Sequence, residues 1–252
     1  MSAFREWIDA APGARLGLWQ ALASNYTAEI CAGAGFDWLL FDGEHAPNNA
    51  QTLLGQLQAV APYPVHVIAR PPVGDAVSIK QYLDIGFTTL LIPMVESAAQ
   101  AEAIVAASRF PPRGIRGVAS STSRASRFGA QADYLATAHE RVGIIVQIES
   151  GAALAAVEEI AAVEGIDGLF IGPADLAASL GYLGNPRAPE VQAAIDRAFA
   201  AIRAAGKPAG IFALDADDAG ARAAQGFAFV SIGTDIGLLA NGGRALLRTC
   251  RA

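Results

Sequence analysis

Two apolar segments of the sequence each lead directly to a carboxylate. Residues 144–148 are followed by Glu149, and residues 169–174 are followed by Asp175. If these segments are neighbouring parallel strands, both carboxylates lie at one rim of a sheet. Carboxylate oxygens are the ligands that a hard divalent cation prefers. The pair therefore predicts a metal site, whereas either acid alone would be interpreted as a turn or capping residue.

Further polar side chains follow other strand-like segments. Trp19 lies near the end of the first, Asp42 and His45 follow the second, Arg70 ends the third and Gln147 lies in the fifth. His45 is a candidate base, since a carboxylate three residues earlier could orient and charge its imidazole. Arg70 could bind a substrate carboxylate through its two-pronged guanidinium group. The sequence thus gathers titratable residues at the carboxyl ends of several strands.

These residues are positioned by an alternation of strands and helices along the whole chain. Near-continuous apolar runs are typical of parallel strands that are buried on both faces. Strands are predicted at Leu16–Trp19, Trp38–Phe41, Val65–Arg70, Thr89–Pro93, Gly143–Glu149, Gly168–Ile171, Ala209–Ala213 and Phe229–Ile232. Helices are predicted at Asn25–Ala34, Asn49–Val60, Val77–Ile85, Ala98–Ser108, Ala152–Val163, Pro189–Ala205, Ala216–Gln225 and Ile236–Leu247. This pattern predicts one α/β domain over residues 1–252, a TIM-type (β/α)8 barrel, with a doubly wound open sheet as the alternative.

Composition limits the possible functions and partners. The 252 residues are 53% hydrophobic and carry a net charge of −6, which argues against a nucleic-acid surface because such a surface needs a basic stripe. No stretch reaches the roughly 18 apolar residues of a membrane helix, and the amino-terminal segment lacks signal-peptide features. We therefore expect a cytoplasmic protein without nucleic-acid or membrane partners. Cys31 and Cys250 are expected to be buried thiols rather than a disulfide.

Several other titratable residues are interpreted as structural. His66 is expected in the core, His139 at the surface, and Asp84 at a solvated helix position unless a neighbouring subunit brings it to a site. The two lysines, Lys80 and Lys207, lie in a predicted helix and at the opposite rim. Neither can form a Schiff base at the active site, so an enzyme that stabilises a carbanion there needs a metal ion.

One segment interrupts the alternation of strands and helices. Residues 110–138 contain adjacent prolines, several glycines and a serine- and arginine-rich stretch at 120–127. A long loop in a compact domain is usually functional or mobile, and this one begins at the rim where TIM barrels carry their active sites. An ordinary solvent-exposed loop explains the segment equally well.

Five of these segments resemble the HpcH/HpaI aldolases, most closely the 4-hydroxy-2-oxoheptane-1,7-dioate aldolases. The similarity extends over nearly the whole chain and is carried by residues 36–49, 91–95, 112–118, 146–149 and 170–176. The resemblance implies a class II, metal-dependent pyruvate aldolase of aromatic catabolism, built on a TIM barrel and assembled as a homohexamer.

The resemblance also implies a role for each matching residue. Glu149 and Asp175 would hold Mg²⁺, Mn²⁺ or Co²⁺, and Arg70 would stabilise an enolate. His45 would be the base, close to Asp42, with Asp84 raising its basicity. The keto acid and the aldehyde would be bound by Gln147, Gly172, Pro173, Ala174, Asp175, Trp19 and Phe212.

The function expected from these roles is the reversible cleavage of 4-hydroxy-2-keto acids. The products would be pyruvate, or a related 2-keto acid, and an aldehyde, formed through a metal-stabilised enolate. Two alternatives remain open at this point. An acyl-CoA lyase of the same barrel superfamily would need a basic surface for the CoA phosphates, for which this chain offers only its loop arginines. A non-catalytic keto-acid-binding barrel would not need the full set of catalytic residue types.

Overall fold

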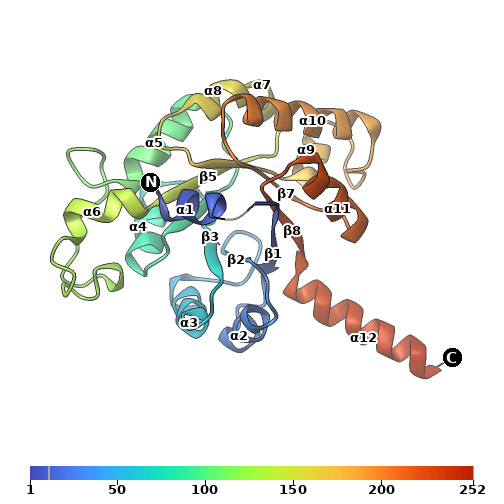
Figure 1. Cartoon of the computed structure of the whole chain (residues 1–252), viewed down its shortest axis with the longest axis horizontal. Coiled ribbons are helices and arrows are strands. Elements are labelled where there is room, and N and C mark those ends of the chain that lie inside the picture. The colour runs from blue at the N-terminus through green and yellow to red at the C-terminus, as the bar shows by residue number, and fades with distance from the viewer. Residues whose placement is uncertain (11, 252) are drawn as a thin grey trace.

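Eight parallel strands close into a barrel in their sequence order (Figure 1). This computed structural model describes residues 1–10 and 12–251. β1 pairs with both β2 and β8, so the sheet has no edge. The predicted TIM-type barrel is therefore confirmed, and the open-sheet alternative is wrong. The strands are β1 (Arg15–Gln20), β2 (Trp38–Asp42), β3 (His66–Arg70), β4 (Thr89–Ile92), β5 (Gly143–Ile148), β6 (Gly168–Ile171), β7 (Ala209–Phe212) and β8 (Phe229–Thr234).

Helices cover the outside of the barrel and begin where the sequence offers capping side chains. The side chains of Asn49, Asp75 and Asp215 accept hydrogen bonds from backbone N–H groups in the first turn of their helices. The predicted helix Ala152–Val163 is helical over most of its length but divided in two, because Ala156 leaves the helical conformation. The helices between strands are α2 (Asn25–Gly33), α3 (Ala50–Val60), α4 (Ala76–Asp84), α5 (Ala98–Ser108), α7 (Gly151–Ala155), α8 (Val157–Ala162), α10 (Pro189–Ala204) and α11 (Ala216–Gln225).

Four short elements do not appear in the sequence prediction. They are α1 (Ala3–Asp9), the 3-10 helix η1 (Arg124–Ser126), α6 (Tyr134–Arg141) and α9 (Pro173–Ser179). The segment 110–138 is thus partly helical rather than an extended loop. His139, predicted at the surface, has only 15% of its side chain exposed because α6 places it against Arg113.

Aromatic rings fill the interior of the barrel. Trp38 has no exposed surface, and its ring centroid lies 6.4 Å from that of Phe170 and 5.9 Å from that of Phe229. A side chain at Gly17 would place its Cβ 2.1 Å from the Trp38 ring, so only glycine fits there. The barrel is a packed core, and ligands reach its centre only from the carboxyl ends of the strands.

The last helix, α12 (Asp235–Arg251), extends away from the barrel (Figure 1). Asp235 is its only buried residue among those described, and it accepts hydrogen bonds from the backbone N–H groups of Ala21 and Leu22. Cys250 is consequently exposed, which corrects the expectation of two buried thiols, whereas Cys31 is buried. Both cysteines are free.

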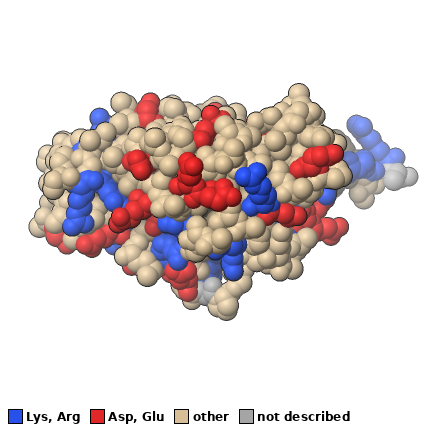
Figure 2. Space-filling view, turned by 90° about the horizontal axis from the view of Figure 1, so that it is seen from above, with Lys and Arg blue, Asp and Glu red and all other residues tan. Residues whose placement is uncertain are grey.

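The surface carries both signs of charge. Figure 2 shows acidic and basic side chains interspersed over one face of the barrel. A group of basic residues lies at the right-hand end of this view. Within residues 1–10 and 12–251, no helix has the length and apolar character needed to cross a membrane.

His66 closes the amino-terminal end of the barrel and makes its stability depend on pH. Its ring stacks on Trp7 at 4.4 Å, and its Nε2 lies 2.9 Å from Thr89 Oγ1. Burial lowers the pKa of His66 from 6.5 to about 4. Between pH 6.5 and pH 4, His66 is protonated in the unfolded chain but neutral in the folded chain. The free energy of unfolding therefore falls as the pH drops from 6.5 to 4. The shift corresponds to about 3 kcal/mol.

The variant His66→Phe keeps a stacked ring and removes the titration. Urea unfolding at pH 4.5 and pH 7 is expected to show a smaller pH dependence in this variant than in the parent. The lost Thr89 contact lowers stability equally at both values. An unchanged pH dependence would assign the acid sensitivity to other groups.

Candidate active site

A cavity of about 430 Å³ lies at the carboxyl ends of the strands. Every residue that the sequence predicts for the site lines this cavity, except Glu149 and Asp84. The cavity also includes residues that the sequence prediction did not select: Ala21, Phe170, Ala213, Leu214 and Thr234. They were missed because apolar side chains and a lone threonine give no chemical signal.

Arg70 and Asp42 form a buried two-point ion pair in the wall of the cavity. Arg70 donates from Nε to Asp42 Oδ1 at 2.9 Å and from Nη2 to Asp42 Oδ2 at 2.8 Å. Their backbones are neighbours, since Asp42 is the register partner of Arg70 across β2 and β3. Burial alone would raise the pKa of Asp42, but hydrogen bonds and charge from Arg70 outweigh it and hold that pKa below its ordinary value.

This ion pair corrects one expectation. The Nε–Nη2 side of the Arg70 guanidinium binds both oxygens of Asp42 and is not free for a substrate carboxylate. Nη1 faces the other way, 2.7 Å from Glu44 Oε2 and 3.5 Å from Gln147 Oε1. The guanidinium also lies 5.0 Å from the ring centroid of Trp19. Arg70 therefore presents a single N–H edge to the cavity, in a fixed orientation.

Glu149 lies immediately after β5 and contacts Gln147, which lines the cavity. Glu149 is 2% exposed. Its Oε1 accepts from Met94 N at 2.8 Å, and its Oε2 accepts from Gln147 Nε2 at 2.5 Å. The pKa of Glu149 is raised to about 7, mainly by burial and in addition by the nearby carboxylates of Glu44 and Asp175, against the lowering effects of the Met94 N–H and of Arg70.

Asp175 lies beside this buried acid, as the opening pattern of the sequence requires. β5 and β6 are hydrogen-bonded parallel neighbours, with Ile148 opposite Ile171. Glu149 and Gly172 therefore follow their strands side by side, and α9 begins at Pro173 with Asp175 in its first turn. Asp175 is exposed to the cavity, whereas Glu149 is covered.

The imidazole of His45 differs from its expected setting. Asp42 contacts only the backbone N–H of His45, at 3.4 Å, because its carboxylate is held by Arg70. The carboxylate near the imidazole is that of Glu44, with 3.8 Å between Oε2 and Nε2. The side chain of His45 is 69% exposed. Glu44 is a site residue that the sequence prediction did not assign, although its place between Asp42 and His45 in the same rim segment could have identified it.

Asp84 lies outside the cavity in this chain. It ends α4, at the opposite end of the barrel, and its Oδ1 accepts from Arg116 Nη2 at 2.6 Å. The structure therefore does not bring Asp84 to His45 within one subunit.

Comparisons with known proteins agree with this arrangement. Residues 15–242 match the model of a family described as HpcH/HpaI aldolase/citrate lyase. The chain belongs to the HpcH/HpaI aldolase/citrate lyase family. It is an aldolase, a carbon–carbon lyase.

Two curated relatives are similar to this aldolase over most of their length. A hydroxypyruvate/pyruvate aldolase of Pseudomonas aeruginosa is 57% identical over 226 residues, covering 90% of this chain and 84% of the relative. A 4-hydroxy-2-oxo-heptane-1,7-dioate aldolase of Salmonella paratyphi C is 54% identical over 232 residues, covering 92% and 88% respectively.

Solved structures share the fold of the aldolase. A family member from Burkholderia cenocepacia J2315 has a TM-score of 0.96 and 40% identity, with complete coverage of both chains. The protein CitE of Mycobacterium tuberculosis, crystallised with magnesium and acetate, has a TM-score of 0.62 at 20% identity, which shows a common fold alone.

The aldolase carries a donor set that fits a hard divalent cation, on which enzymes of this family generally depend. Glu149 is buried, has a raised pKa and lies near the carboxylates of Glu44 and Asp175. A bound cation would offset the repulsion among these negative charges. The described part of the chain contains no group of three or more His, Cys, Asp or Glu side chains arranged around one metal position. A cation held by Glu149 and Asp175 would thus keep positions open for substrate, as a catalytic site needs.

Gly172 leaves the space that this part of the aldolase site requires. A Cβ at this position would lie 2.8 Å from Glu149 Oε2 and 2.9 Å from Gln147 Nε2. Gly172→Ala is therefore expected to displace Glu149 and lower kcat by at least about 100-fold, the scale of losing one placed polar group. The control Gly220→Ala changes a glycine in α11 that has no atom within 4 Å of such a Cβ. Steady-state kinetics at saturating metal test this, and near-parent activity of Gly172→Ala would contradict it.

Proposed function

We propose that this aldolase reversibly cleaves 4-hydroxy-2-keto acids to pyruvate, or a related 2-keto acid, and an aldehyde. The observation that carries the proposal is the buried Glu149 next to Asp175, beside a cavity in which Arg70, held by Asp42, is the one arginine among the described lining residues. Relatives named as pyruvate and 4-hydroxy-2-oxo-heptane-1,7-dioate aldolases, at 57% and 54% identity, support this substrate class.

The keto acid is assigned to the end of the cavity next to Glu149 and Asp175. A cation held by Glu149 and Asp175, which we propose to be Mg²⁺, Mn²⁺ or Co²⁺, would supply Lewis-acid polarisation of the keto acid. Gln147 and the backbone of Gly172, Pro173, Ala174 and Asp175 border this end and would orient the carboxylate. Arg70 Nη1 would stabilise negative charge where it develops on the keto oxygen.

The aldehyde is assigned to the aromatic end of the cavity. The ring centroid of Trp19 lies 5.4 Å from that of Phe212 and 5.6 Å from that of Phe170. These rings exclude water from the carbon–carbon bond that is cleaved and favour aldehydes with apolar bodies.

Proton transfer is assigned to His45. Its exposed imidazole at the cavity lip can take the proton of the C4 hydroxyl directly or through one water. Glu44, 3.8 Å away, would favour the protonated imidazole that results. Asp84 would raise the basicity of His45 only from a neighbouring subunit, since it lies at the other end of its own barrel.

The deciding experiment measures pyruvate release from a panel of 4-hydroxy-2-keto acids with Mg²⁺, Mn²⁺ or Co²⁺, before and after chelation. We expect metal-dependent release, with metal added back restoring it. A parallel NMR measurement of deuterium entering the methyl group of pyruvate tests enolate formation. Deuterium exchange excludes a non-catalytic binding barrel, and cleavage of CoA esters in place of keto acids would favour an acyl-CoA lyase.

We further propose that the protein is a homo-oligomer, with six subunits as the family resemblance implies. The support is α12, whose leucines 238, 239, 246 and 247 are 54–68% exposed and belong to neither apolar cluster of the described residues. The outer faces of β1 and β8 leave Leu16 and Ile232 more than a third exposed. A helix from a second copy would cover both apolar surfaces.

Light scattering tests this assembly. Leu239→Glu with Leu246→Glu is expected to lower the particle mass, whereas Asn241→Glu, at an exposed polar position of the same helix, is expected to leave it unchanged. Equal masses for both variants would contradict a role for α12 in assembly.

A further inference from the structure

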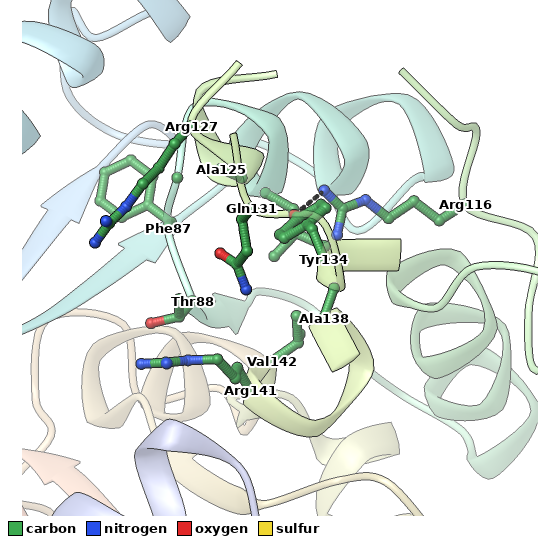
Figure 3. Close-up of a pocket in the computed structure, with 12 residues that line it drawn as sticks. Phe87, Thr88, Arg116, Ala125, Arg127, Gln131, Tyr134, Ala138, Arg141 and Val142 are labelled. Atoms are coloured by element: carbon green, nitrogen blue, oxygen red, sulfur yellow. Dashed lines mark hydrogen bonds between the residues drawn. The ribbon is translucent and has the colours of Figure 1, made fainter. Parts of the chain in front are cut away.

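A second cavity, of about 210 Å³, lies beneath the segment that interrupts the strand and helix alternation (Figure 3). Thr88 directly precedes β4 and Val142 directly precedes β5, so this cavity lies at the opposite end of the barrel from the active site. Its lining consists of Leu83, Gly86, Phe87, Thr88, Arg116, Ala125, Arg127, Gln131, Tyr134, Ala138, Arg141 and Val142.

The charge of this lining has one sign. Arg116, Arg127 and Arg141 contribute three guanidinium groups, and no Asp or Glu is among the described residues that line the cavity. Arg116 is 2% exposed, lies 4.5 Å from the ring centroid of Phe110 and is paired with Asp84. That pair neutralises one charge and leaves two. Arg116 Nε is buried and has no hydrogen-bond partner among the described residues.

The other two guanidinium groups are not engaged elsewhere. Within residues 1–10 and 12–251, the side chains of Arg127 and Arg141 take part in no ion pair or hydrogen bond that meets ordinary geometry. Figure 3 shows the ends of both side chains on the same side of the view, with Thr88 between them in height and Gln131 nearer to Tyr134. Two exposed guanidinium groups, a hydroxyl and an amide thus line one cavity, with no carboxylate among its described lining residues.

We propose that this cavity binds a small dianion carrying oxyanion groups, a dicarboxylate or a phosphate. Planar guanidinium groups bind carboxylate and phosphate oxygens through paired N–H donors, and a doubly charged ligand matches the two unpaired arginines. The volume corresponds to about seven waters at ~30 Å³ each, which accommodates phosphate or a four-carbon dicarboxylate. Within one subunit this site is separate from the catalytic cavity, and its ligand differs in charge from the aldehyde and from a keto acid with a single carboxylate.

Isothermal titration calorimetry with sodium phosphate and with sodium succinate tests this site on the whole protein, with chloride holding the ionic strength constant. Arg127→Gln with Arg141→Gln removes the two unpaired charges. The matched control, Arg197→Gln with Arg203→Gln, removes two charges from the exposed face of α10. Circular dichroism and the pyruvate-release rate check that both variants keep the parent fold and catalytic site.

We expect binding of at least one dianion, weakened about tenfold or more in Arg127→Gln/Arg141→Gln and unchanged in the control, since charge-assisted hydrogen bonds are lost. Binding of phosphate alone identifies a phosphate group as the ligand, and binding of succinate alone identifies a dicarboxylate. Any dianion that binds in the catalytic cavity persists equally in both variants. Equal affinity in the parent and Arg127→Gln/Arg141→Gln, or no binding of either dianion, overturns the proposal.

Discussion

Glu149→Gln is expected to reduce the metal-dependent cleavage rate by at least about 1,000-fold, the upper scale for removing one electrostatic group from an active site. Glutamine preserves the shape of the side chain and can still accept from Met94 N. It removes the negative charge that, with Asp175, forms the donor pair. Because the buried charge is unfavourable without a cation, the variant is expected to fold at least as stably as the metal-free parent.

The measurements are steady-state kinetics over a wide range of Mn²⁺ concentrations and the effect of Mn²⁺ on thermal unfolding. Mn²⁺ is expected to raise the melting temperature of the parent and not that of Glu149→Gln, because only a ligand that binds the folded state stabilises it. Glu158→Gln, which removes an exposed glutamate on α8, is the matched control. Full activity of Glu149→Gln in the presence of chelator would remove the basis of the metal site.

Arg70→Lys is expected to lower kcat by about 100- to 1,000-fold while the protein stays folded. Lysine retains the positive charge beside Asp42, so the buried carboxylate is not left without a partner. An ammonium group cannot donate to both oxygens of Asp42 and also face Glu44 and Gln147, as the planar guanidinium does. The fall in kcat therefore measures the effect of the fixed orientation of the guanidinium group rather than of its charge.

The comparison between kcat and KM distinguishes stabilisation of the transition state from ordinary substrate binding. A fall in kcat with little change in KM is expected if Nη1 acts on charge that develops during cleavage. Arg203→Lys, an exposed replacement on α10, is the control. A rise in KM alone would assign Arg70 to holding the bound keto acid.

The sequence predicted the barrel well because its strands are continuous apolar runs with clear ends. β6, Gly168–Ile171, was predicted residue for residue, and so was α5, Ala98–Ser108. The shorter elements were missed where composition and structure disagree. α6 follows a segment that contains serine, arginine and glycine, and no side chain caps its first turn. The break at Ala156 lies in an alanine-rich run whose composition predicts one continuous helix.

The sequence allowed most residues of the site to be predicted, but not which of their side chains form ion pairs with one another. Rim residues can be identified from the strand ends, so the prediction selected Asp42, Arg70 and His45. Which carboxylate binds which cation depends on side-chain direction across β2 and β3, and sequence spacing does not give that direction. Asp42 therefore binds Arg70 rather than the imidazole, and Glu44 takes the place that was expected for Asp42.

The aromatic core of the barrel has a consequence for inhibition. Because the Trp38 ring closes the interior below the site, ligands have one route in and out, through the opening at the carboxyl ends of the strands. The keto acid and the aldehyde must therefore enter and leave through the same opening. In the synthetic direction, an excess of either substrate is expected to obstruct the entry of the other.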